Sequence, residues 1–91
     1  MAQVLCEVSE GLRPTEVTVT IKDVHGRPQF LRIDRDFIVS EAGQSYLPVG
    51  VVHDDRTRGV VLIELPYEAD SGANRLWVRL TDLLQETGAA T

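Results

Sequence analysis

The chain has 91 residues, the size of one domain, and its 43% hydrophobic and 25% charged residues are typical of globular proteins. No apolar run approaches the roughly 20 residues of a membrane-spanning helix, and the start lacks the basic and apolar stretches of a signal peptide. We therefore expect a soluble, cytoplasmic protein. A net charge of −5 disfavours nucleic-acid phosphates and anionic lipid surfaces as partners.

Residues 2–8 predict the first strand, because Val4, Cys6 and Val8 alternate along it and would share one face. Cys6 is the only cysteine, which excludes an internal disulfide. Acidic residues are its nearest charged neighbours, and a reactive thiol needs a basic neighbourhood. We expect Cys6 to be a buried, unreactive member of the core.

Residues 15–24 show the clearest alternation in the chain, with Val17, Val19 and Ile21 pointing one way and polar side chains the other. One side of this strand should therefore face solvent. The next segment, residues 29–39, has two apolar stretches separated by the charged triplet at 34–36. It predicts either two strands or one bent strand with a bulge.

Three further strands are predicted at 46–53, 59–65 and 75–80, joined by polar loops, and the rest of the chain is expected to lie around this meander. The middle one is short and nearly all apolar, which is typical of a strand covered on both faces. Pro48 and Gly50 indicate that the first half of the 46–53 strand is an edge or a bend.

The 75–80 strand alternates strictly between apolar residues expected to face inward (Leu76, Val78 and Leu80) and larger side chains expected to face outward (Arg75, Trp77 and Arg79). Asp82 followed by Gln85 is a capping-box pattern. It predicts a single helical turn at 83–86, after which residues 87–91 would form a frayed tail. The expected domain is residues 1–86.

The predicted fold is all-β: a small, strongly bent barrel or barrel-like antiparallel sheet of about five to six strands, closed by a one-turn C-terminal helix. In this strand pattern the chain resembles the Src-homology-type small barrels. The resemblance covers the spacing of strands and not a motif, and it implies a binding module.

The sequence offers one candidate interaction surface: Arg75, Trp77 and Arg79 on the last strand, with Tyr67 and Asp70 in the loop before it. An aromatic side chain between arginines is typical of a protein-interface hot spot. The same arrangement can stack the bases of a single-stranded nucleic acid. A third interpretation is that Trp77 is covered by its own neighbouring strand or loop.

The other candidate sites in the sequence lack the residue pattern that their chemistry requires. His25 and His53 both lie at predicted turns and could bind a metal only if separate hairpins brought them together with a carboxylate. Ser71 lacks the strained turn of a catalytic nucleophile, and the loop containing Glu68, Asp70 and Asn74 lacks calcium-binding spacing. We expect a non-catalytic protein-interaction or accessory module without metal or cofactor; the alternative is an oligonucleotide-binding small barrel.

Overall fold

The structure is a computed structural model that describes residues 2–85, and within them it consists of one antiparallel sheet of eight strands with two 3-10 helical turns. The strands are β1 (Ala2–Glu10), β2 (Glu16–Lys22), β3 (Pro28–Asp34), β4 (Val39–Glu41), β5 (Gln44–Asp55), β6 (Val60–Glu64), β7 (Arg75–Arg79) and β8 (Leu83–Gln85). The turns are η1 (Arg35–Phe37) and η2 (Leu80–Asp82). The all-β class and the barrel-like antiparallel sheet are confirmed.

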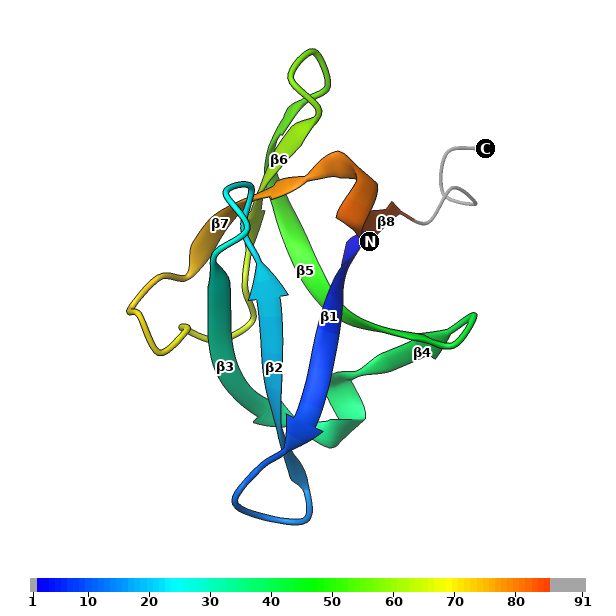
Figure 1. The fold of residues 1–91 in the computed structure, drawn as a ribbon, viewed down its shortest axis with the longest axis vertical. Coiled ribbons are helices and arrows are strands. Elements are labelled where there is room, and N and C mark those ends of the chain that lie inside the picture. The colour runs from blue at the N-terminus through cyan, green and yellow to red at the C-terminus, as the bar shows by residue number, and fades with distance from the viewer. Residues whose placement is uncertain (1, 86–91) are drawn as a thin grey trace.

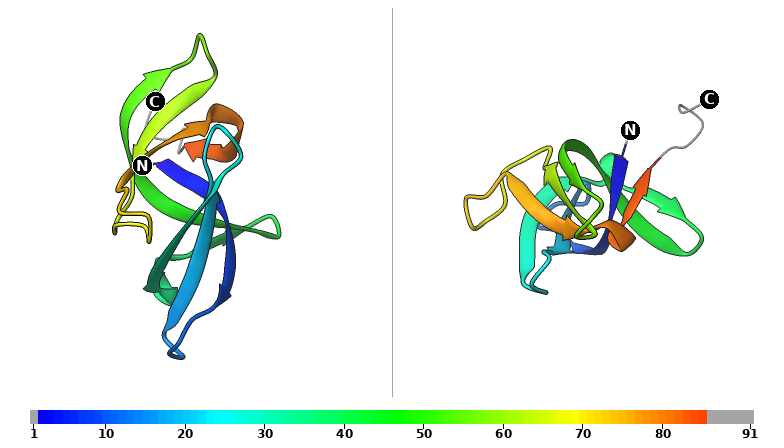
Figure 2. Two further views of the ribbon diagram at one scale, coloured as in Figure 1. Left: turned by 60° about the vertical axis from the view of Figure 1, so that its left-hand side comes forward. Right: turned by 90° about the horizontal axis from the view of Figure 1, so that it is seen from above.

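The sheet is built from two meanders of three strands each (Figure 1). Strands β1 and β5 pair at its centre, β2 and β3 continue on one side, and β6 and β7 on the other, giving the order β3-β2-β1-β5-β6-β7. The short β4 pairs with the start of β5, and β8 with the start of β1. The sheet curls into a half-barrel, so β3 and β7 lie on the same side of the molecule (Figures 1 and 2).

The inner face of this curl is the hydrophobic core, and strand alternation sets which residues enter it. The residues predicted to face inward on β2 and β7 are buried (Val17, Val19, Ile21, Leu76 and Val78), but Leu80, expected to continue the β7 set, is only half-buried and lies in η2. In β6, Val61 and Ile63 are buried beside them. Cys6 is buried as expected. Val8, expected on the same face, is 37% exposed, although its ladder partner Val19 on β2 is fully buried.

The expectation that the middle strand is covered on both faces is wrong. In β6 only the inward set is buried, whereas Val60 and Leu62 on the other face are partly exposed. Its long apolar run reflects neighbours on β5 and β7 that cover the outward side chains in part. The centre of the sheet is the β1–β5 pair.

The first half of the 46–53 strand was expected to be an edge or a bend, and around Pro48 it has a partner on one side only, where β1 pairs with β5 through Val49. On the other side of β5, pairing with β4 ends at Tyr46 and pairing with β6 begins at Gly50. Pro48 therefore lies in the gap between two partner strands, an edge-like position at which proline is tolerated. A bulge between Val51 and His53 adds the bend.

The 29–39 segment is two strands separated by η1, so the alternative of a single bent strand is wrong. The side chain of Asp34 caps η1 by accepting a hydrogen bond from the N–H of Asp36 (2.9 Å). Such side-chain capping favours a helical turn over a continuing strand. The turn redirects the chain into β4.

The predicted C-terminal helical turn is displaced along the chain. The turn is η2, at Leu80–Asp82, and residues 83–85 form β8, which pairs with Ala2–Val4 of β1. The Asp82–Gln85 pattern therefore does not cap a helix. A strand so short forms because a partner 80 residues away satisfies its backbone groups. The predicted tail, 87–91, lies outside the described residues.

The outer strands β3 and β7 form no ladder with each other in the described chain. Instead, a loop beside each of them forms a backbone hydrogen bond to the other. The loop at 66–74 reaches β3, where the N–H of Asp70 donates to the carbonyl of Phe30 (2.7 Å). The turn after β2 reaches β7, where the N–H of Val24 donates to the carbonyl of Trp77 (2.8 Å). We call this pair of hydrogen bonds the reciprocal clasp.

Within residues 2–85, no helix has the length and apolar character required to cross a membrane.

Candidate functional site

The outer face of β7 carries Arg75, Trp77 and Arg79, all exposed, as the alternation predicts. Both arginines already have carboxylate partners. Arg75 Nε lies 4.0 Å from Glu64 on β6, and an Arg79 guanidinium nitrogen lies 3.2 Å from Asp82 in η2. Their charges are therefore largely balanced within the domain.

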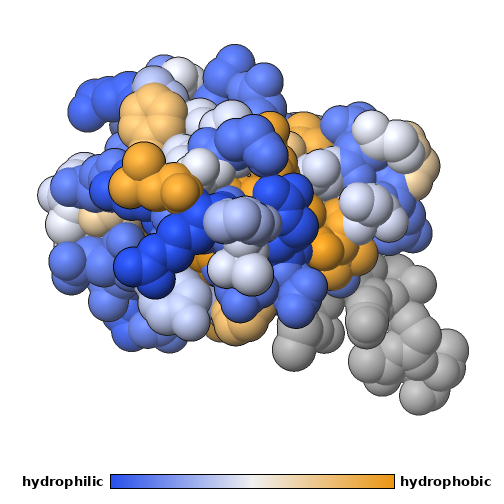
Figure 3. Space-filling model, turned by 90° about the horizontal axis from the view of Figure 1, so that it is seen from below, coloured by the Kyte–Doolittle hydropathy of each residue, from blue (hydrophilic) through white to orange (hydrophobic). Residues whose placement is uncertain are grey.

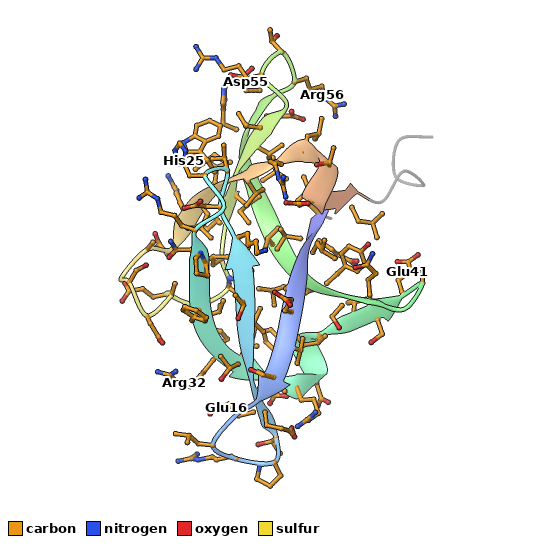
Figure 4. The ribbon with its side chains drawn as sticks, viewed as in Figure 1. Glu16, His25, Arg32, Glu41, Asp55 and Arg56 are labelled. Carbon is orange, nitrogen blue, oxygen red and sulfur yellow. The ribbon has the colours of Figure 1, made fainter. Side chains whose placement is uncertain are left out.

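Trp77 is partly buried by neighbouring side chains, with 39% of its surface exposed to solvent. Leu62 of β6 lies directly beside it in the ladder, and the His53 ring meets the indole edge to face, with centroids 6.0 Å apart. The clasp hydrogen bond from Val24 brings the β2–β3 turn to the same strand. Figure 4 shows His25, the next residue in that turn, on this side of the molecule.

Tyr67 and Asp70, which the sequence grouped with this row, lie instead in the loop along β3. Two Arg32 guanidinium nitrogens donate to the two Asp70 carboxylate oxygens at 3.3 and 3.2 Å. Tyr67 stacks on Phe37 of η1, with ring centroids 6.0 Å apart and planes 29° apart. The predicted surface therefore divides into the β7 row and a separate loop region.

The loop region contains two aromatic residues that the sequence reasoning missed. Phe30 and Phe37 are 43% and 41% exposed, although neither belongs to the predicted interaction surface. Strict alternation along β3, with Leu31 and Ile33 buried, would have placed Phe30 outside. The contact of Phe37 with Tyr67 joins residues 30 positions apart, and no local pattern encodes it.

Most aromatic residues of this domain lie on its surface, whereas in most domains they lie in the core. Of the five in the chain, Phe30, Phe37, Tyr67 and Trp77 are exposed and Tyr46 is half-buried. The buried core of the described chain consists only of Ala, Val, Leu, Ile and one Cys. Figure 3, which views the end where η1 and the β1–β2 connection lie, shows apolar side chains exposed between hydrophilic ones.

The charges near the loop region are mostly acidic. Asp34 precedes η1, Asp36 lies within it, and Glu68 follows Tyr67. All three are exposed, and none forms an ion pair with another described residue. Arg35 is directed away, toward the β1–β2 connection. Its guanidinium donates to Glu10 (3.1 Å) and to the Pro14 carbonyl (3.2 Å).

Two of the residues considered for catalysis and metal binding, Ser71 and Asp70, have structural partners. Ser71 Oγ donates to Gln29 Oε1 (2.8 Å), and Asp70 is occupied by Arg32. Among residues 2–85, no group of three His, Cys, Asp or Glu side chains is placed to hold a metal ion, so His25 and His53 do not converge on one. Burial raises the pKa of the Cys6 thiol to about 11.

Comparisons of the chain with protein-family models, curated proteins and solved structures give no match.

Proposed function

We propose that this domain is a non-catalytic protein-interaction module. The observation that carries the proposal is the placement of four large aromatic side chains on the surface of a domain whose core is aliphatic. Aromatic residues and arginine are enriched in protein interfaces, and a few of them supply most of the binding energy. A domain this small gives up core volume by leaving these rings outside.

The fold holds the exposed rings on rigid supports. Trp77 projects from the middle of a paired strand, and Phe37 and Tyr67 brace each other between η1 and the loop. Aromatic side chains in fixed positions offer contact area with little rotamer entropy left to lose on binding. The cytoplasmic location expected from the sequence stays a prediction.

The alternative, oligonucleotide binding at Trp77, has weaker support. Stacking platforms for single strands lie in positively charged grooves. Here the two arginines beside Trp77 are paired with carboxylates, and the net charge is −5. A phosphate backbone would therefore meet a carboxylate beside each of these arginines.

The test is partner capture with matched variants. The tagged domain, a Trp77→Ala variant and a Phe37→Ala/Tyr67→Ala variant are each cross-linked in cell extract, and captured proteins are quantified by mass spectrometry. We expect specific proteins to be captured by the wild type and lost with one variant. Capture that is equal for all three forms contradicts the proposal.

The same forms are titrated with labelled single-stranded DNA by fluorescence anisotropy at two salt concentrations. Binding that depends on Trp77 and weakens steeply with salt would favour the alternative. We expect no saturable binding.

A further inference from the structure

We propose that the stacked rings of Phe37 and Tyr67, here called the ring pair, dock an extended peptide segment that carries Lys or Arg beside large apolar side chains. This inference rests on the proposed interaction function and names the partner chemistry and the place. It assigns the β7 row no part in the contact.

The ring pair is an apolar surface left open by the fold. Phe37 is 41% exposed and Tyr67 is 50% exposed, although the two rings already cover part of each other. Phe37 comes from η1 and Tyr67 from the 66–74 loop, so the ring pair forms only in the folded domain. Its shape is set before a partner arrives.

The loop beneath Tyr67 is fixed at several points. Its Ala69 side chain is buried in the core at 4% exposure, and the clasp hydrogen bond holds Asp70 to β3. Arg32 donates two hydrogen bonds to the Asp70 carboxylate, and the Ser71 hydroxyl donates one to the Gln29 side chain. Because the loop is already ordered, binding at Tyr67 loses little further conformational entropy.

Charge selects the occupant. Asp36 precedes Phe37 directly and Glu68 follows Tyr67 directly, and neither has an ion-pair partner among the described residues. The arginines of β3 and η1, Arg32 and Arg35, form ion pairs with Asp70 and Glu10. A cationic side chain would be attracted to the free carboxylates and to the faces of the rings, whereas acidic segments and nucleic acid would be repelled.

The experiment selects peptides from a phage-displayed library of random linear sequences, with the folded domain as bait. Binders that also bind a Phe37→Ser/Tyr67→Ser variant are removed. We expect the retained peptides to be enriched in Lys or Arg next to Leu, Ile, Phe or Trp. NMR titration of the labelled domain with a selected peptide should shift the amides of Phe37, Tyr67 and their neighbours.

A charge-reversal pair tests the electrostatic part without touching the rings. For the selected peptide, the Asp36→Lys/Glu68→Lys variant should weaken binding by at least about tenfold, because rim charges of the same sign repel the ligand. The matched control is Glu41→Lys, an exposed carboxylate at the tip of the β4–β5 hairpin, which lies on the other side of the molecule from the 66–74 loop in Figure 4. It should leave the affinity unchanged. NMR spectra of all variants verify that the fold persists.

Three outcomes would overturn the inference. Enrichment of acidic or uncharged peptides refutes the partner chemistry, and equal weakening by the Glu41 control refutes the local role of Asp36 and Glu68. Failure to retain any binder that depends on the ring pair refutes the site. If partner capture in extract is then lost only with Trp77→Ala, the interaction function stands while this inference falls.

Discussion

At the scale of single residues, Trp77 has an exposure between that of a surface and a core aromatic. Full burial would make its removal cost about 3–5 kcal/mol, and full exposure less than about 0.5 kcal/mol. With 39% of its surface exposed, we expect Trp77→Ala to lower the free energy of unfolding by about 1–2 kcal/mol. Urea unfolding followed by circular dichroism measures the change.

The control for this variant is His53→Ala, which removes only the edge-to-face ring contact and should cost about 0.5–1.5 kcal/mol. Fluorescence of the native protein should also be quenched in part by acrylamide. A loss above about 3 kcal/mol for Trp77→Ala, together with unquenched emission, would show that the indole is buried in solution.

Cys6 gives a second prediction at this scale. Its pKa of about 11 keeps the thiol protonated at neutral pH, and only the thiolate attacks a disulfide reagent. The native protein should therefore react with Ellman's reagent far more slowly than the same protein in urea. Rapid labelling before unfolding would mean that β1 does not pack as described.

At the scale of elements, the β4–β5 turn contains a correctable strain. Ala42 has φ = 53° and Gly43 has φ = 78°, and a two-residue hairpin turn with two positive φ angles favours Asn-Gly. The left-handed backbone conformation is unfavourable for Ala and less so for Asn. We expect Ala42→Asn to raise the free energy of unfolding by about 0.5–1 kcal/mol.

Thermal unfolding measures this gain, and the neighbouring Glu41→Asn, outside the left-handed position, should give none. A melting temperature that stays the same or falls for Ala42→Asn would show that the turn carries no such strain.

The β2–β3 turn gives a pH-dependent prediction. Desolvation, the largest single influence, acts to raise the pKa of Asp23. The backbone N–H groups of Arg27 and His25, with nearby positive charge, outweigh it, so the pKa lies below the ordinary 3.8. A carboxyl pKa lowered by folding adds stability that is present above 3.8 and disappears as pH falls through the folded value.

The stability difference between the wild type and Asp23→Asn should therefore shrink as buffers are taken from neutral pH to below 3.8. Asn keeps an oxygen acceptor for both N–H groups but cannot titrate, so it isolates the charge. A difference that is constant across this series would show that the charge of Asp23 does not contribute.

The same scale shows what the sequence could and could not predict. Alternation is a local signal, and it predicted the inward sets of β2 and β7 and the outward Trp77. The unbroken apolar run of β6 did not indicate which of its two faces is partly exposed. The short β8 forms only because β1 lies beside it, and η1 is stabilised by one side-chain cap from Asp34. Contacts between distant segments, such as Phe37 with Tyr67, have no period to detect.

At the scale of the whole molecule, stability depends on one aliphatic core shared by both meanders. Ile63 is fully buried, and Ile63→Ala should cost about 2–5 kcal/mol, because it removes buried methyl groups and leaves a cavity. Urea unfolding measures the loss. Val52→Ala, at a 40% exposed position of β5, is the control and should change stability by less than about 1 kcal/mol. Similar losses at both sites would contradict the assigned core.

The reciprocal clasp hinders edge-to-edge pairing of strands between two molecules. A half-barrel leaves two outer strands whose free N–H and C=O groups are templates for pairing with another chain, the usual start of aggregation. The clasp occupies the carbonyl of Trp77 at the middle of β7 and that of Phe30 near the start of β3, which itself begins at Pro28. Each outer strand thus has its edge interrupted by a loop of the other meander. An incoming strand would have to displace that loop before it could form a continuous ladder.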